Sequence, residues 1–138
     1  MCELTIAICE EDFTKALSHI SAYTPFDQFE KLQVRLLKTI CLYELNYYEL
    51  FLLEEDSFEK FSDNHDNLEE HVLRLKKYYK YIGTLFRLRE KFDITKFVKL
   101  YKEVFSDMSS HKWLKNTLIK MKEENGVKMK LIEMKTAS

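Results

Sequence analysis

The sequence predicts an all-α fold, in which antiparallel helical hairpins stack as a short α-solenoid. Turn-forming residues are scarce, because the 138 residues include only two glycines and one proline. Sheet-containing folds need many tight turns and therefore many such residues. A helix-start pattern, a polar cap followed by a first turn, also recurs at Asp12–Leu17, Asn46–Phe51 and Asp93–Val98. Recurring helix starts indicate repeated hairpins, and stacked hairpins usually serve as binding scaffolds.

Three helices are expected before residue 46. The first covers about residues 2–9 and is apolar on nearly every side, so it needs cover on two faces. The second begins at Asp12, a good N-cap residue, and ends near Ala22. Pro25 opens the third helix, because proline suits a first turn, and this helix runs to about Leu45.

Asn46 marks a tight reversal into a fourth helix over about residues 47–61. Its expected buried side chains are Leu50, Phe51, Phe58 and Phe61. The polar run at residues 62–67 is the clearest loop of the chain.

One long helix is expected over about residues 66–92, and Asp66 with Glu69 resembles a capping box at its start. Apolar residues along it alternate steps of four and three, as in a coiled-coil seam. The seam consists of Leu68, Val72, Leu75, Tyr79, Ile82 and Phe86.

Two further helices complete the prediction of about seven. Asp93 caps a helix that runs to about Phe105, and Ser109 or Ser110 caps the last. The run Glu123–Gly126 predicts a C-terminal stop. We therefore expect one helical-repeat domain over residues 1–122 and a tail over 123–138, either a frayed helix or disordered.

Charge is distributed unevenly along the chain. Residues 1–70 carry 5 basic and 16 acidic side chains, a net −11, and residues 71–138 carry 17 basic and 7 acidic side chains, a net +10. Such asymmetry suggests a partner, a neighbouring domain or head-to-tail association. The alternative is that the charges coat two solvated faces.

The spacing of the helix starts resembles that of tetratricopeptide-type repeats. Phe13 and Tyr48 lie 35 residues apart, close to the 34-residue period, and Ala16 occupies the small-residue position. Phe51 and Phe97 stand where that position recurs. The stretch from Phe26 to Met121 also resembles the C-terminal helical region of uncharacterised repeat proteins from Bacteroidetes-type bacteria. The resembling segments are Leu36–Leu45, Tyr79–Arg89 and His111–Leu114. The resemblance implies a fold and carries no activity with it.

No pattern of the sequence indicates catalysis, a metal or a cofactor. His65 and His71 are six residues apart, which does not place them on one helix face. No Ser or Cys stands in a nucleophile motif, and the cysteines Cys2, Cys9 and Cys41 lie in apolar stretches as reduced, buried thiols. The carboxylates of Glu54–Asp56 fit a solvated face. We therefore expect a protein that is not an enzyme.

Two surfaces are candidates for binding a partner. The first is the basic, tyrosine-containing stretch of the long helix, where phosphate contacts and base stacking would bind nucleic acid; the competing interpretation is a solvated outer face. The second is the apolar helix at residues 2–9, which would meet a second copy as a homodimer, meet an upstream repeat, or be covered by the tail through Val127, Leu131 and Met134. The candidate residues are Arg74, Lys77, Tyr78, Tyr81, Leu4 and Ile8.

The sequence thus favours a non-catalytic scaffold that binds a protein or peptide, at the C-terminal end of a longer repeat protein or alone. The alternative is a small helical nucleic-acid-binding protein that uses the basic half. A cytoplasmic location is expected, because no signal peptide and no apolar run of about 20 residues is present.

Overall fold

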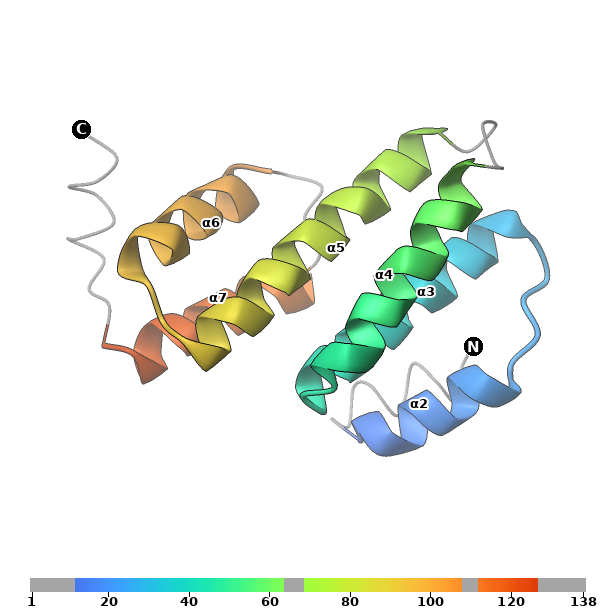
Figure 1. Ribbon diagram of the computed structural model, residues 1–138, viewed down its shortest axis with the longest axis horizontal. Coiled ribbons are helices and arrows are strands. Elements are labelled where there is room, and N and C mark those ends of the chain that lie inside the picture. The colour runs from blue at the N-terminus through green and yellow to red at the C-terminus, as the bar shows by residue number, and fades with distance from the viewer. Residues whose placement is uncertain (1–11, 64–68, 108–111, 127–138) are drawn as a thin grey trace. The chain divides into compact units, whose positions relative to one another are not determined.

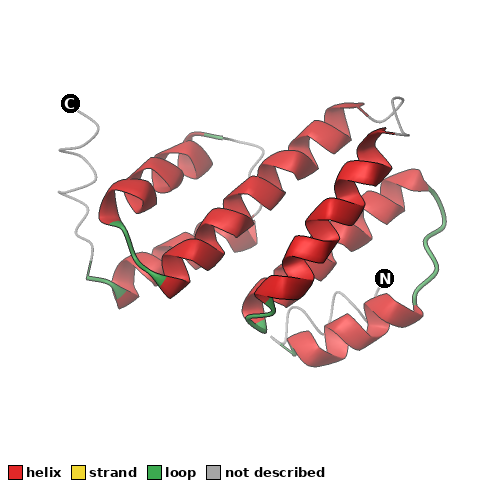
Figure 2. Ribbon diagram, in the orientation of Figure 1, coloured by secondary structure: helices red, strands yellow, loops and turns green. Residues whose placement is uncertain are grey.

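The computed structural model describes residues 12–63, 69–107 and 112–126, and throughout these ranges the regular structure is helical, without a strand (Figure 2). The helices are α2 (Phe13–Ala22), α3 (Gln28–Glu44), α4 (Tyr48–Asp63), α5 (Glu69–Glu90), α6 (Ile94–Ser106) and α7 (Lys112–Glu124). The all-α prediction is therefore confirmed for the described residues. The expected helix at residues 2–9 and the tail beyond residue 126 lie outside them, as do the caps expected at Asp66, Ser109 and Ser110.

Two compact units divide the chain, one ending at Phe86 and the other beginning at Arg87, so that the boundary falls inside α5. In the first unit α2 packs on α3, and α3 packs on α4. In the second unit α6 packs on α7. Successive helices pack in pairs in both units (Figure 1).

Aspartate caps begin two helices where the sequence predicts them. The Asp12 carboxylate accepts a hydrogen bond from the Lys15 amide at 3.1 Å, and the Asp93 carboxylate accepts from the Thr95 and Lys96 amides at 2.9 and 3.2 Å. These amides are among the first N–H groups of their helices, which have no partner inside the helix. The caps therefore fix where α2 and α6 begin.

The start predicted for α3 at Pro25 is wrong. Asp27 is the N-cap, and its carboxylate accepts from the Glu30 amide at 2.8 Å. The Glu30 carboxylate in turn accepts from the Phe26 amide at 3.0 Å and from the Tyr23 hydroxyl. Proline offers no side-chain acceptor for the amides of a first turn, whereas aspartate does, so the helix begins at the aspartate.

Asn46 makes the reversal between α3 and α4, as predicted. Its φ is 60°, in the left-handed region that asparagine tolerates better than most residues. The Asn46 amide donates to the Tyr43 carbonyl at 3.0 Å, and the Tyr47 amide donates to the Leu42 carbonyl at 2.8 Å. These two bonds form a Schellman motif, which satisfies the last carbonyls of α3 and turns the chain directly into α4.

Aromatic side chains form the core between α3, α4 and the first part of α5. The Phe51 ring lies 5.1 Å from the Phe86 ring, the Phe58 ring 4.7 Å from the Tyr79 ring, and the Tyr43 ring 5.1 Å from the Phe86 ring. The described seam residues of α5 are all buried, as predicted: Val72, Leu75, Tyr79, Ile82 and Phe86. Aromatic pairs of this kind hold the helices together through contact area and ring geometry.

The second unit has a smaller core. Phe97, Val104, Leu114 and Leu118 are fully buried on α6 and α7. The helix α7 ends at a turn in which Gly126 has a φ of 64°, so the predicted stop is confirmed. Glycine reaches this backbone conformation without the steric cost that a Cβ adds.

Candidate functional site

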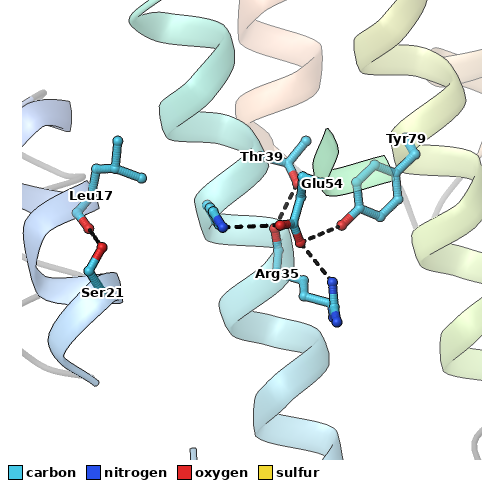
Figure 3. Close-up of polar contacts among 7 residues, drawn as sticks. Leu17, Ser21, Arg35, Thr39, Glu54 and Tyr79 are labelled. Atoms are coloured by element: carbon cyan, nitrogen blue, oxygen red, sulfur yellow. Dashed lines mark hydrogen bonds and ion pairs between the residues drawn. The ribbon is translucent and has the colours of Figure 1, made fainter. Parts of the chain in front are cut away.

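A buried carboxylate joins three helices of the first unit. Glu54 on α4 is 7% exposed, and its Oε1 accepts from the Arg35 guanidinium of α3 at 2.8 Å (Figure 3). The Lys38 ammonium of α3 lies 3.1 Å from Oε2, and the Tyr79 hydroxyl of α5 donates to Oε1 at 3.3 Å. The sequence interpretation of Glu54 as part of a solvated face is therefore wrong, because its charge is neutralised by two cations from a helix 16 to 19 residues earlier.

Aromatic rings flank the arginine of this cluster. The Arg35 guanidinium lies over the Phe61 ring at 4.9 Å, and its side chain is 21% exposed. Burial, and then the negative charge of Glu54, raise the pKa of the Tyr79 hydroxyl, so this group stays protonated and can donate. In this cluster the Glu54 carboxylate accepts hydrogen bonds from the Arg35 guanidinium and the Tyr79 phenol, so these polar groups have hydrogen-bond partners inside the protein.

Glu54 lies on the buried side of α4 together with two phenylalanines. Phe51, Glu54 and Phe58 follow steps of three and four, so they lie on one side of α4 and are all buried. Helix geometry places successive residues about 100° apart, so Leu50–Leu53 cannot all face the core. With Phe51 and Glu54 inside, Leu50, Leu52 and Leu53 face outward and are 49%, 47% and 67% exposed.

The α4 outer face is the name used below for these leucines together with the exposed charged residues around them. It consists of Glu49, Leu50, Leu52, Leu53, Asp56, Glu59 and Lys60. Three carboxylates and one ammonium give it a net negative charge, and the ammonium of Lys60 pairs with Asp56 at 3.3 Å. The prediction that Leu50 is buried is thus wrong, for the geometric reason just given.

The candidate residues of the long helix divide by exposure. Arg74 and Lys77 are exposed, whereas Tyr78 and Tyr81 are buried. Arg74 lies 3.9 Å from Glu70, one turn earlier. The structure thus leaves the basic side chains in solvent without exposed tyrosine rings beside them. Leu4 and Ile8 lie outside the described residues.

Groups that could perform chemistry are few in the described part of the chain. No group of three or more His, Cys, Asp or Glu side chains gathers there as metal ligands. The ring of His71 packs edge-on against Phe29 at 5.0 Å, and His65 lies outside the described residues. Burial raises the pKa of the Cys41 thiol to about 12, which keeps it protonated and a poor nucleophile. None of the described helices combines the length and apolar character that a membrane crossing requires.

Comparison with known proteins adds no further guide to function. No protein-family model, no curated protein and no solved structure matches the chain. The functional interpretation therefore rests on the geometry above, in which the α4 outer face carries three of the exposed large apolar side chains. Its signal in the sequence was the run of four apolar residues at 50–53, which exceeds what one buried helix face can use.

Proposed function

We propose that the protein is a non-catalytic scaffold of tetratricopeptide-like hairpins that binds another protein through the α4 outer face. The observation that carries this proposal is the exposure of Leu50, Leu52 and Leu53 on one helix of the first unit. Single exposed leucines are common on protein surfaces. Leu50 and Leu53 lie one turn apart on the same side of α4, and neighbouring exposed leucines are typical of a surface that a partner covers.

The arrangement of the first unit supports the scaffold. In it, α2 packs on α3 and α3 on α4, with the tight reversal at Asn46 between the last two. Packing of successive helices on their neighbours is the organising rule of helical-repeat proteins, which present side chains of one helix to a ligand. The Glu54 cluster supports the same proposal, because it holds the presenting helix in one orientation before a partner arrives.

The nucleic-acid alternative has weaker support. Its strongest element was base stacking on tyrosines among basic residues. Tyr78 and Tyr81 are buried, and the exposed leucines lie among carboxylates, which repel phosphate.

The test is affinity capture with the full chain and two variants. Leu50→Ser/Leu53→Ser removes the exposed apolar surface, and Leu73→Ser removes a leucine of similar exposure, 51%, from α5. We expect a protein that is retained by the wild type and by Leu73→Ser and is lost with the double variant. Retention that nuclease treatment abolishes, or a retained protein insensitive to the double variant, would contradict the proposal.

A further inference from the structure

We infer that the second unit binds an acidic segment of another protein across the end of α6 and the start of α7. This surface is separate from the α4 outer face, so the inference does not depend on the proposed function. It is carried by a group of lysines around an exposed aromatic ring. The α6–α7 basic surface is the name used below for Lys102, Phe105, Lys112 and Lys115.

The four residues of the α6–α7 basic surface lie next to one another at the edge between the two helices. Lys102 and Phe105 are one turn apart on α6, and Lys112 and Lys115 are one turn apart on α7. The Lys115 ammonium lies over the Phe105 ring, 6.0 Å from its centroid, which joins the two pairs into one surface. The Phe105 side chain is 38% exposed, Lys112 is exposed, and the other two lysines are partly exposed.

Positive charge predominates in this part of the chain. The described residues of the second unit include ten basic and six acidic side chains, whereas those of the first unit include nine basic and twelve acidic ones. Glu103 is two positions from Phe105, about 200° around the helix, so it lies on another side of α6. Asp107 follows the last residue of α6 as its C-cap. Three neighbouring ammonium groups repel one another, and the carboxylates of a partner would relieve this repulsion.

The aromatic ring favours a protein segment over nucleic acid. The Tyr101 ring stacks on the Phe105 ring with centroids 4.3 Å apart, and the Lys115 ammonium also lies over it, so little open ring face remains for a base. An aliphatic side chain, by contrast, can contact the exposed edge of the ring. The chain as a whole has a net charge of −1, without the excess of positive charge that is typical of nucleic-acid-binding domains. A segment of carboxylates that flank an aliphatic residue therefore fits this surface best.

The experiment measures binding of a synthetic peptide to the full chain by fluorescence anisotropy. The probe is a peptide of about ten residues in which glutamates flank a central pair of leucines. At about 3.3 Å per residue it spans both helices, because packed helices lie about 8–10 Å apart. The matched control peptide has lysine in place of every glutamate. We expect the glutamate peptide to bind more weakly as salt is added, and the lysine peptide to bind at least about tenfold more weakly than the glutamate peptide.

Variants of the chain then localise the binding. Lys102→Glu/Lys112→Glu reverses one charge on each helix and should weaken binding of the glutamate peptide by about tenfold or more. Lys76→Glu/Lys77→Glu makes the same change of net charge at two exposed lysines of α5 in the first unit, and it should leave the affinity nearly unchanged. Circular dichroism checks that both variants keep their helix content.

Three results would overturn the inference. Equal weakening by the two double variants would show a general effect of charge, and equal binding of the two peptides would show that charge does not select the ligand. A single-stranded DNA that binds more tightly than the glutamate peptide, and that Lys102→Glu/Lys112→Glu no longer binds, would assign the surface to nucleic acid. Leu50→Ser/Leu53→Ser should leave binding of the glutamate peptide unchanged, so failure of this inference and failure of the proposed function are distinguishable.

Discussion

Removing the Glu54 carboxylate tests whether the buried cluster holds the first unit together. Glu54→Ala leaves the Arg35 guanidinium, 21% exposed, without the carboxylate that it contacts at 2.8 Å. A hydrogen bond to a charged group contributes about 1.5–3 kcal/mol. Lys38 is 40% exposed, so its pair contributes at most about 1 kcal/mol. We therefore expect the variant to lose about 2–4 kcal/mol of unfolding free energy, somewhat less than the full loss of one partner in a completely buried pair.

Urea unfolding provides the assay and the controls. Far-UV circular dichroism follows both units, whereas fluorescence of the single tryptophan, Trp113 on α7, follows the second unit. The loss should therefore appear in the dichroism transition of the first unit. Asp56→Ala, which removes an exposed pair with Lys60 at 3.3 Å, should cost about 0.5 kcal/mol or less. Glu54→Gln, which keeps the shape and one acceptor, should fall between the two. A cost below about 1 kcal/mol for Glu54→Ala, or one equal to that of Asp56→Ala, would refute the reasoning.

Three further predictions concern the core, the reversal and the thiol. Phe51→Ala should lower the unfolding free energy by about 3–5 kcal/mol in the same urea assay, because the Phe51 ring is fully buried. Phe26→Ala is the control, because the Phe26 ring is almost fully exposed, and it should lower the unfolding free energy by about 0.5 kcal/mol or less. Asn46→Ala should cost about 1 kcal/mol and Asn46→Gly should cost less, because φ is 60° there. In a chain with Cys2 and Cys9 changed to serine, Cys41 should react with a disulfide reagent at pH 8 more than about 100-fold more slowly in the native state than in urea.

The Cys41 thiol also predicts a pH dependence of stability. Its pKa is raised from 9.0 in the free residue to about 12 by burial and by the charge of Glu44. The native state therefore holds this proton more tightly than the unfolded state. Its contribution to stability is complete below pH 9 and is lost progressively as the pH rises towards 12. Unfolding free energies measured over this range should fall less steeply in Cys41→Ala than in the parent chain, and parallel curves would contradict the assignment.

Local signals in the sequence predicted much of the fold. Asp12 and Asp93 were correctly identified as caps because a carboxylate before an apolar turn satisfies amides of its own helix. The reversal at Asn46 could be predicted because a residue with a left-handed backbone conformation is recognised from the residue type and its immediate neighbours. The buried seam of α5 could be predicted because a helical period is visible within the helix itself. The start of α3 differs from the predicted one at Pro25 because the Asp27 side chain, two residues later, caps the first turn.

The candidate site could not be predicted in the same way. The sequence pattern of α4 predicts that Leu50, Phe51 and Phe58 are buried, and the structure buries the two phenylalanines but exposes Leu50. Glu54 is buried beside Arg35 and Tyr79, which are 19 and 25 residues away along the chain. Glu54 is followed in the sequence by two other acidic residues, a pattern that is typical of a solvated face. Its burial becomes evident only when the positions of Arg35 and Tyr79 are known. Both the burial of Glu54 and the exposure of Leu53 therefore follow from tertiary contacts.

Site-specific photo-crosslinking tests most directly whether the α4 outer face binds a protein. A photoreactive amino acid placed at Leu53, and in a matched variant at Leu73, would be irradiated in a lysate of the source cells. We expect a discrete protein adduct from position 53 that is absent from position 73 and is unaffected by nuclease. An adduct of equal yield from both positions, an adduct with nucleic acid, or no adduct at position 53 would contradict a protein-binding role for this face.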